Sequence, residues 1–222
     1  MPTKPQLKFT AWSYSRYQDY VRCPLYAKLK HLDKRPVEQG AAMGRGDTIH
    51  KEAEAWTMGK LKKLPESLEN FKDEFKDLRK VKGVQCEVQW AISASWDKAD
   101  WFGPTAWCRL KVDAWHVKGK VLTVIDHKTG KIYPDHPEQL HLYGAAGFAL
   151  FPDVEKVRAE LWYLDQGETN DRDYERGQFG DMKKLWEDRV RPMFADRQFA
   201  PRPNDKCRFC DFRKERGGPC KY

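Results

Sequence analysis

The chain of 222 residues is long enough to bury a core without disulfide bonds, and its composition is that of a globular protein. It carries 41 Lys and Arg against 33 Asp and Glu, a formal net charge of +8, with a mean hydropathy of -0.84. Its longest nearly unbroken apolar run, residues 143–151, is far shorter than the roughly 20 residues of a transmembrane helix, which excludes a membrane span. No apolar run follows the basic residues at the start, so we expect no secretory signal.

The positive charge gathers at the two ends of the sequence. Residues 1–50 hold nine Lys and Arg against four Asp and Glu, and residues 201–222 hold seven against three. The same two segments contain four of the six cysteines. If the ends meet in the fold, they form one basic patch that suits a polyanion such as nucleic acid; a solvated surface is the alternative. Without export, the cysteines are expected to be metal ligands or reduced thiols.

Helical patterns dominate the first 60 residues. Ser13 is placed to cap a helix that ends at Cys23, where a proline follows, and residues 25–32 form a second helical stretch. Asp47 is expected to cap a further helix that Gly59 closes.

A sheet is expected in residues 81–165, after one more helix over residues 65–78. Alternating apolar residues predict strands over residues 84–92 and 108–114. A glycine turn at residues 118–120 leads into an apolar and therefore central third strand, residues 121–125.

The remaining elements alternate between helix and strand. We expect a helix over residues 137–148, a strand over residues 157–164 and a helix over residues 179–194, followed by an irregular cysteine-rich tail over residues 200–222. This order predicts an α/β fold, with a central mixed sheet flanked by helices.

Two carboxylates and a lysine carry the strongest chemical signal. The turn at Gly119 makes its flanking strands antiparallel neighbours, which brings Asp113 close to Asp126, and Lys128 shares a strand face with Asp126. Two carboxylates at the end of a buried strand repel each other, and Mg²⁺ or Mn²⁺ relieves this repulsion. A lysine beside such a metal can neutralise charge on a pentacovalent phosphate, as a phosphodiesterase requires. The alternative is an ordinary Asp-x-Lys sequence on an exposed strand end.

A second candidate site is formed by cysteines. Cys207 and Cys210 form a CxxC pair, Cys220 follows nine residues later, and Cys23 is the natural fourth ligand. Four thiolates suit zinc or a [4Fe–4S] cluster, and the spacing alone does not choose between them. Cys23 as a buried thiol and a tail without metal are the alternatives. The other two cysteines lie on apolar strand faces and are expected in the core.

In order along the chain, several motifs resemble those of the PD-(D/E)XK nuclease superfamily and, within it, the RecB-like exonucleases. The matching segments are S13-Y-S-R-Y-x-x-Y-x-x-C23-P24, M43-G-R-G-D-T-I-H50, V112-D113, I125-D126-H-K128-T-G130, Q139-L-H-L-Y143 and C207-R-F-C210 with Cys220. The cysteines resemble those of the family's iron–sulfur members, which include CRISPR-associated RecB-like nucleases and the AddB nuclease domain. The resemblance implies one nuclease domain over residues 1–222, with a restriction-endonuclease-like core and both ends joined at a metal cluster.

The resemblance also implies a role for each matching residue. His50, Asp113, Asp126 and the main-chain carbonyl of His127 would bind Mg²⁺ or Mn²⁺, and Lys128 would position water and stabilise the transition state. The remaining roles fall to residues around this site and at the ends of the chain: Glu87 as a further acidic residue, Gln139 and Tyr143 as DNA contacts or support, and Cys23, Cys207, Cys210 and Cys220 as ligands of a [4Fe–4S] cluster, with zinc as the alternative.

The expected function is therefore a metal-dependent DNA exonuclease that processes single-stranded or end-containing DNA in recombination or repair. An endonuclease, a trimming nuclease of CRISPR adaptation and a non-catalytic DNA-binding scaffold are the alternatives. No G-x-x-x-x-G-K-[ST] motif occurs, so unwinding would need a helicase or recombination partner. We expect a cytoplasmic location, in a bacterium or a virus of bacteria.

Overall fold

Contacts along the chain divide it into two units in the computed structural model, which describes residues 8–38 and 41–222. The first unit combines Met1–Gln39 with Leu185–Tyr222, and the second is Gly40–Lys184. The N- and C-terminal segments thus belong to one unit, as expected of ends that meet. The single domain expected over residues 1–222 stays a prediction.

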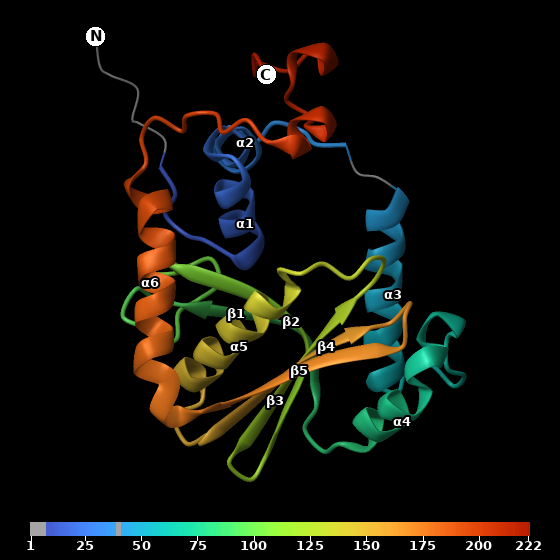
Figure 1. Cartoon of the computed structure of the whole chain (residues 1–222). Coiled ribbons are helices and arrows are strands. Elements are labelled where there is room, and N and C mark those ends of the chain that lie inside the picture. Colours follow the sequence, from blue (N-terminus) through green and yellow to red (C-terminus); the bar gives the residue numbers. More distant parts are fainter. Residues whose placement is uncertain (1–7, 39–40) are drawn as a thin grey trace. The chain divides into compact units, whose positions relative to one another are not determined.

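The second unit holds a five-stranded mixed sheet with helices around it (Figure 1). Its elements are α3 (Ala41–Thr57), η2 (Glu66–Phe71), α4 (Lys72–Lys80), β1 (Gln85–Ile92), β2 (Cys108–Lys118), β3 (Val121–Lys128), α5 (His136–Leu150), β4 (Lys156–Tyr163), β5 (Glu168–Glu175), η3 (Arg176–Gln178) and the start of α6 (Phe179–Ala195). The expected α/β class is confirmed, and the architecture is consistent with a restriction-endonuclease-like core.

The strands lie in the order β1-β2-β3-β4-β5. Only β3 and β4 are parallel, and α5 connects them, because a parallel pair needs a crossover. The β2–β3 hairpin turns at Gly119, whose φ of 60° suits glycine. The sequence analysis missed β5, because its residues, ETNDRDYE, are polar and mostly exposed, and only pairing with β4 makes them a strand.

Helices cover both faces of the sheet. On one face, a core cluster joins α3, η2 and α4 to the sheet through buried side chains that include Phe75, Ile125 and Trp162. On the other face, α5 approaches closely: a Cβ at Gly147 would lie 2.7 Å from Leu122 and 3.0 Å from Val157. Both faces of the central strands are therefore buried, and this explains their nearly continuous apolar sequence.

Two expected helix starts are wrong. Asp47 does not cap a helix, because α3 begins six residues earlier, at Ala41, and Asp47 lies inside it. Pro65 precedes a 3₁₀-helix, η2, and the α-helical turns begin only at Lys72. At Asp47 the helix continues through a residue that is common at helix starts, because packing outweighs this weak local preference.

The first unit contains α1 (Tyr14–Arg22), α2 (Pro24–Ala27), η1 (Lys28–Leu32), the end of α6, η4 (Asp205–Phe209) and η5 (Lys214–Arg216). The Ser13 hydroxyl accepts a hydrogen bond from the Arg16 N–H at 3.3 Å, which confirms the expected cap. Trp12 and Trp186 are fully buried, with ring centroids 5.5 Å apart. This contact links the N-terminal and C-terminal segments of the unit.

Within the described parts of the chain, every helix is too short or too polar to cross a membrane.

The close approach of α5 to the sheet predicts a stability effect. Gly147→Leu should lower the free energy of unfolding by about 1–3 kcal/mol, because the added side chain overpacks the contact with Leu122 and Val157. Gly180→Leu is the matched control, since a Cβ at exposed Gly180 meets nothing within 4 Å. Urea unfolding of both variants measures the difference, and equal midpoints would contradict the packing described here.

Candidate active site

The candidate active site lies where β2 and β3 separate. The last pair of their ladder is Ala114 with Ile125, so Asp113 and Asp126 come directly after it. At this point the main-chain N–H of His127 donates a hydrogen bond to Oδ2 of Asp113 over 2.6 Å. The two carboxylates that the sequence predicts as neighbours thus flank the separation of the strands.

Asp126 is held by three side chains. The Tyr143 hydroxyl donates to Oδ1 of Asp126 at 2.5 Å, and Nε2 of Gln139 donates to the same oxygen at 3.2 Å. Nζ of Lys128 lies 2.7 Å from Oδ2 of Asp126 and donates to Oε1 of Gln139 at 2.8 Å. Gln139 and Tyr143, one turn apart on α5, are also bonded to each other at 2.8 Å. The helix therefore positions both charged groups on β3.

The buried side chains of Asp126 and Lys128 stay charged in this network. Burial alone would raise the pKa of Asp126, but the charge and hydrogen bond of Lys128 outweigh burial and lower it. Burial would lower the pKa of Lys128, and the charge of Asp126 reverses this and raises it. Burial and the charge of Asp126 together raise the pKa of Tyr143 well above its usual value. Near neutral pH the site thus holds a carboxylate, an ammonium group and a neutral phenol.

His50 reaches the site from α3. Its Nδ1 lies 3.1 Å from Oδ1 of Asp113 and 3.8 Å from Oε1 of Glu87. Burial by itself lowers the pKa of His50, but the carboxylates of Asp113 and Glu87 raise it to about 10. The hydrogen bond to His50 in turn lowers the pKa of Glu87. A cation bound between these groups would take the place of the His50 proton.

Gly46, before His50, lies where α3 passes close to the loop after β3. A Cβ at Gly46 would lie 3.1 Å from the Thr129 hydroxyl, so the helix passes this loop at short range. Next to it, the Arg45 guanidinium forms two hydrogen bonds to Asp165, at 2.5 and 2.9 Å, and Asp165 accepts the Gly130 N–H at 2.6 Å. This link is not predictable from the sequence, because nothing local connects Arg45 to a residue 120 positions later.

The imidazole of His127 is a feature that the sequence analysis did not predict. His127 is 4% exposed, and its ring lies 6.0 Å from the ring of His50 between centroids. Neither ring nitrogen has a hydrogen-bond partner among the described residues. Burial lowers the pKa of His127, which favours the neutral form that binds metals. The resemblance implies a main-chain ligand here, whereas the side chain also offers a donor.

Glu87 has an unusual backbone conformation. Its φ of 54° lies in the left-handed region, although it stands inside β1, where neighbouring residues pair with β2. A side chain in this region costs about 1–3 kcal/mol, and such strain is found most often at functional sites. In this conformation the Glu87 carboxylate lies 3.8 Å from Nδ1 of His50.

His50, Asp113 and His127 form the group best suited to hold a metal ion. One donor atom from each residue lies within 4.8 Å of the others. Asp126, whose oxygens contact Lys128, Gln139 and Tyr143, adjoins this group. Imidazole and carboxylate donors suit Mn²⁺ and other transition metals, and carboxylates also suit Mg²⁺.

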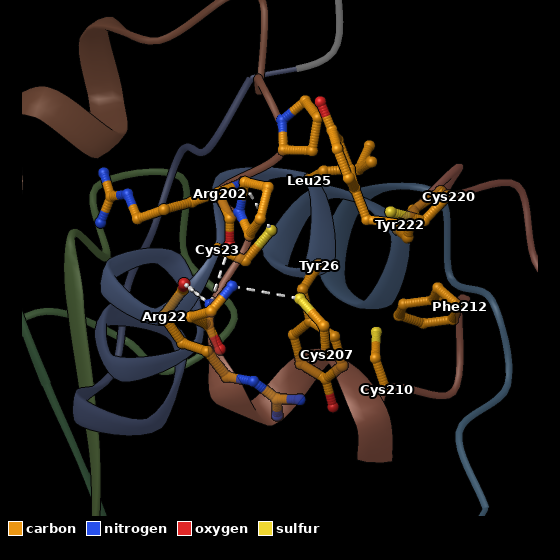
Figure 2. A pocket seen from close by; sticks show the side chains of 14 residues that line it. Arg22, Cys23, Leu25, Tyr26, Arg202, Cys207, Cys210, Phe212, Cys220 and Tyr222 are labelled. Atoms are coloured by element: carbon orange, nitrogen blue, oxygen red, sulfur yellow. Dashed lines mark hydrogen bonds between the residues drawn. The ribbon is translucent and has the colours of Figure 1, made fainter. Parts of the chain in front are cut away.

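The four cysteines predicted as ligands line one pocket (Figure 2). Cys23 lies between α1 and α2, Cys207 is in η4, Cys210 directly follows η4, and Cys220 is near the end of the chain. Main-chain N–H groups donate to two of the sulfurs, from Arg202 to Cys23 and from Asn204 to Cys207, both at 3.3 Å.

The other two cysteines behave as expected of core residues. Cys108 is fully buried, and burial raises the pKa of its thiol well above the usual value. Cys86 is partly buried against the core cluster of the sheet, and burial raises its pKa to about 12. Neither thiol is poised to ionise.

Comparison with known proteins gives one family. The model of the PD-(D/E)XK nuclease superfamily matches residues 109–214, just under half of the chain. A solved structure titled "Crystal structure of SSO0001" is 20% identical, with 92% of this chain and 84% of that chain covered and a TM-score of 0.45. No match was found among curated proteins. Because nucleases of this superfamily use divalent metals, the match implies a metal-dependent nuclease that acts on DNA.

The ion pairs of His50 predict its titration in the metal-free protein. Histidine NMR should give a pKa near 10, and Glu87→Gln should lower it, because one carboxylate partner is removed. Asp153→Asn, exposed in the turn before β4 and at the end of the sheet opposite Asp126, is the control and should leave it unchanged. Since the folded pKa exceeds the unfolded value, this contribution to stability is complete below about pH 6.5 and is lost as pH rises through 10. A pKa near 6.5 would contradict these contacts.

Proposed function

We propose that this chain is a RecB-like nuclease of the PD-(D/E)XK superfamily and hydrolyses phosphodiester bonds at DNA ends. The observation that carries the proposal is the pair Asp113 and Asp126 at the separation of β2 and β3, with Lys128 ion-paired to Asp126 at 2.7 Å. All three residues lie inside the segment that the superfamily model matches. A metal-binding group of His50, Asp113 and His127 adjoins them.

The residues present fit a divalent cation. The unpartnered nitrogens of buried His127 and the carboxylate of Asp113 offer donors on the same side as His50. His50 and Asp113 would hold the metal, joined by Asp126 and by His127 through its ring or its main-chain carbonyl. When bound, Mg²⁺ or Mn²⁺ supplies a Lewis acid for the phosphate and lowers the pKa of water.

Lys128 would act on the reacting phosphate. Its ammonium group is fixed by Asp126 and Gln139, so it meets the substrate without reorganisation. In the reaction, the oxygen of water forms a bond to phosphorus, a phosphorus–oxygen ester bond breaks, and the leaving oxygen takes up a proton. Lys128 stabilises the negative charge that develops during this step. Gln139 and Tyr143 hold Asp126 and Lys128 in place, and Glu87 orients His50.

For the cysteine pocket we propose a [4Fe–4S] cluster. The support is that Cys23, Cys207, Cys210 and Cys220 line one pocket within a single unit. A zinc ion with sulfur ligands at about 2.3 Å would draw the sulfurs to about 3.8 Å from one another. Among the described residues no three thiols come within 4.8 Å of one another, so the wider spacing favours a cluster over zinc.

The cluster would link the two ends of the chain. Cys23 and Cys207 are separated by more than 180 residues, so their common ligation restricts the unfolded chain and adds a few kcal/mol of stability, at about the level of a disulfide. Its role in this proposal is to hold the basic terminal segments together rather than to transfer electrons. Reduced thiols are maintained in the cytoplasm, which is the location we propose.

Exonuclease action is our preferred form, and the alternatives remain endonuclease action, trimming in CRISPR adaptation and a scaffold without activity. The intact set of Asp113, Asp126 and Lys128 argues against a scaffold. A helicase partner would supply unwinding, since the 222 residues contain no P-loop motif.

Cleavage of end-labelled linear DNA tests the proposed activity. Wild-type protein should shorten the DNA with Mn²⁺ or Mg²⁺ and not with EDTA, and Lys128→Ala should reduce the rate at least about 100-fold. Glu54→Gln, on α3 outside the site, is the control. A covalently closed circle separates the two modes of cleavage: an exonuclease leaves it intact. If Lys128→Ala cleaves at the wild-type rate, the site is assigned wrongly.

Visible absorption tests the cluster independently of cleavage. Protein purified without oxygen should absorb broadly in the visible range and contain about four iron and four sulfide per chain, as a [4Fe–4S] cluster requires. Cys207→Ser should lose this colour and unfold at lower temperature, whereas Cys86→Ser, outside the pocket, should keep it. Colourless wild-type protein with one zinc per chain would contradict the proposal.

A further inference from the structure

The hairpin of β1 and β2 extends beyond the candidate active site. Glu87 and Asp113 lie opposite each other on these strands, and pairing continues to Ile92 and Cys108. At a rise of about 3.4 Å per residue, the five residues from Asp113 to Cys108 span about 17 Å. The loop that joins the strands, residues 93–107, therefore stands well outside the reacting centre.

Two aromatic residues occupy the turn of this loop. The Gly103 N–H donates to the Asp100 carbonyl at 2.9 Å, which closes a β-turn with Trp101 and Phe102 at its centre. Such positions favour small polar residues, and aromatic residues there gain nothing from the turn itself. Phe102 is nevertheless 88% exposed. The turn thus presents an aromatic ring to solvent.

The loop is ordered by its own contacts. The Trp107 N–H donates to the Ile92 carbonyl at 2.8 Å, and the Ala99 N–H donates to the Ala91 carbonyl at 2.9 Å. The ring of buried Trp96 packs edge-on against Trp107, with centroids 5.6 Å apart. Because the loop is already fixed, a ligand that binds Phe102 loses little free energy to the ordering of this loop.

Positive side chains connect this turn to the site. Arg109, Lys111 and Asp113 occupy alternate, less buried positions along β2. The Arg109 guanidinium lies 5.8 Å from the centre of the Trp101 ring, and Lys111 is exposed. A nucleic-acid strand whose reacting phosphate lies at Asp113 would pass Arg109 and Lys111 before it reaches the turn.

We propose that Trp101 and Phe102 form a stacking site for unpaired bases of single-stranded DNA, with Lys111 and Arg109 contacting the phosphates between this turn and the active site. Aromatic side chains stack on any base, so the site selects single strands without selecting a sequence. At the roughly 3.4 Å per nucleotide of one strand of duplex DNA, the 17 Å span corresponds to at most about five nucleotides. This inference rests on the proposed nuclease function and specifies its substrate.

The test is binding of fluorescent oligo(dT) of graded length in EDTA, where no cleavage occurs. Phe102→Ala should weaken binding of a 20-mer at least about fivefold, and Phe102→Trp should retain it. Val117→Ala, at the opposite end of β2 and also partly exposed, is the control and should bind as wild type does. The difference between wild type and Phe102→Ala should vanish for oligomers of about four nucleotides.

Salt dependence separates stacking from phosphate contact. Phe102→Ala should leave the slope of log affinity against log salt unchanged, and Lys111→Gln should reduce it by about 0.7. Equal affinity of Phe102→Ala and wild type for the 20-mer would overturn the stacking site, as would an equal loss on blunt duplex DNA. If either of these results is found and wild-type protein still cleaves DNA, the stacking site is wrong but the proposed nuclease function stands. Wild-type protein that neither binds nor cleaves DNA would instead overturn both.

Discussion

The ion pair between Asp126 and Lys128 is the interaction on which the candidate site depends. Burying either charge alone would cost several kcal/mol, so each is retained because the other is present. Gln139 and Tyr143 complete the hydrogen bonds of this pair from α5. The helix can reach them because Gly147, one turn after Tyr143, lets α5 lie close to the sheet. The electrostatics of the site therefore depend on the close packing of α5 against the sheet.

A second constraint acts on the other side of the separated strands. His50 is brought to Asp113 by a helix whose position depends on the short contact at Gly46 and on the pair of Arg45 with Asp165. The strained conformation of Glu87 adds a carboxylate to the same cluster. Negative charges thus converge on His50, and in the metal-free protein its proton partly neutralises them. This is the environment in which a divalent cation can replace a proton.

The two units contribute different physical functions in the proposal. The sheet unit contains the carboxylates, the lysine and the aromatic turn, all on elements fixed by core packing. The unit formed by both ends of the chain contains the cysteine pocket and much of the positive charge. Common ligation of cysteines from both ends would reinforce the small buried cluster of Tyr26, Leu29 and Phe212 beside that pocket.

The α/β class, the β2–β3 hairpin and the proximity of Asp113, Asp126 and Lys128 can all be predicted from the amino-acid sequence, because they depend on local periodicity and on one glycine turn. It also predicted that Gln139 and Tyr143 lie one turn apart on one helix. That β5 is a strand becomes visible only in the folded chain, since its polar residues gain order from pairing with β4. Likewise, the ring of His127 and the pair of Arg45 with Asp165 join residues through contacts that no local pattern encodes. Local preferences are weak, and packing between distant segments decides where they conflict.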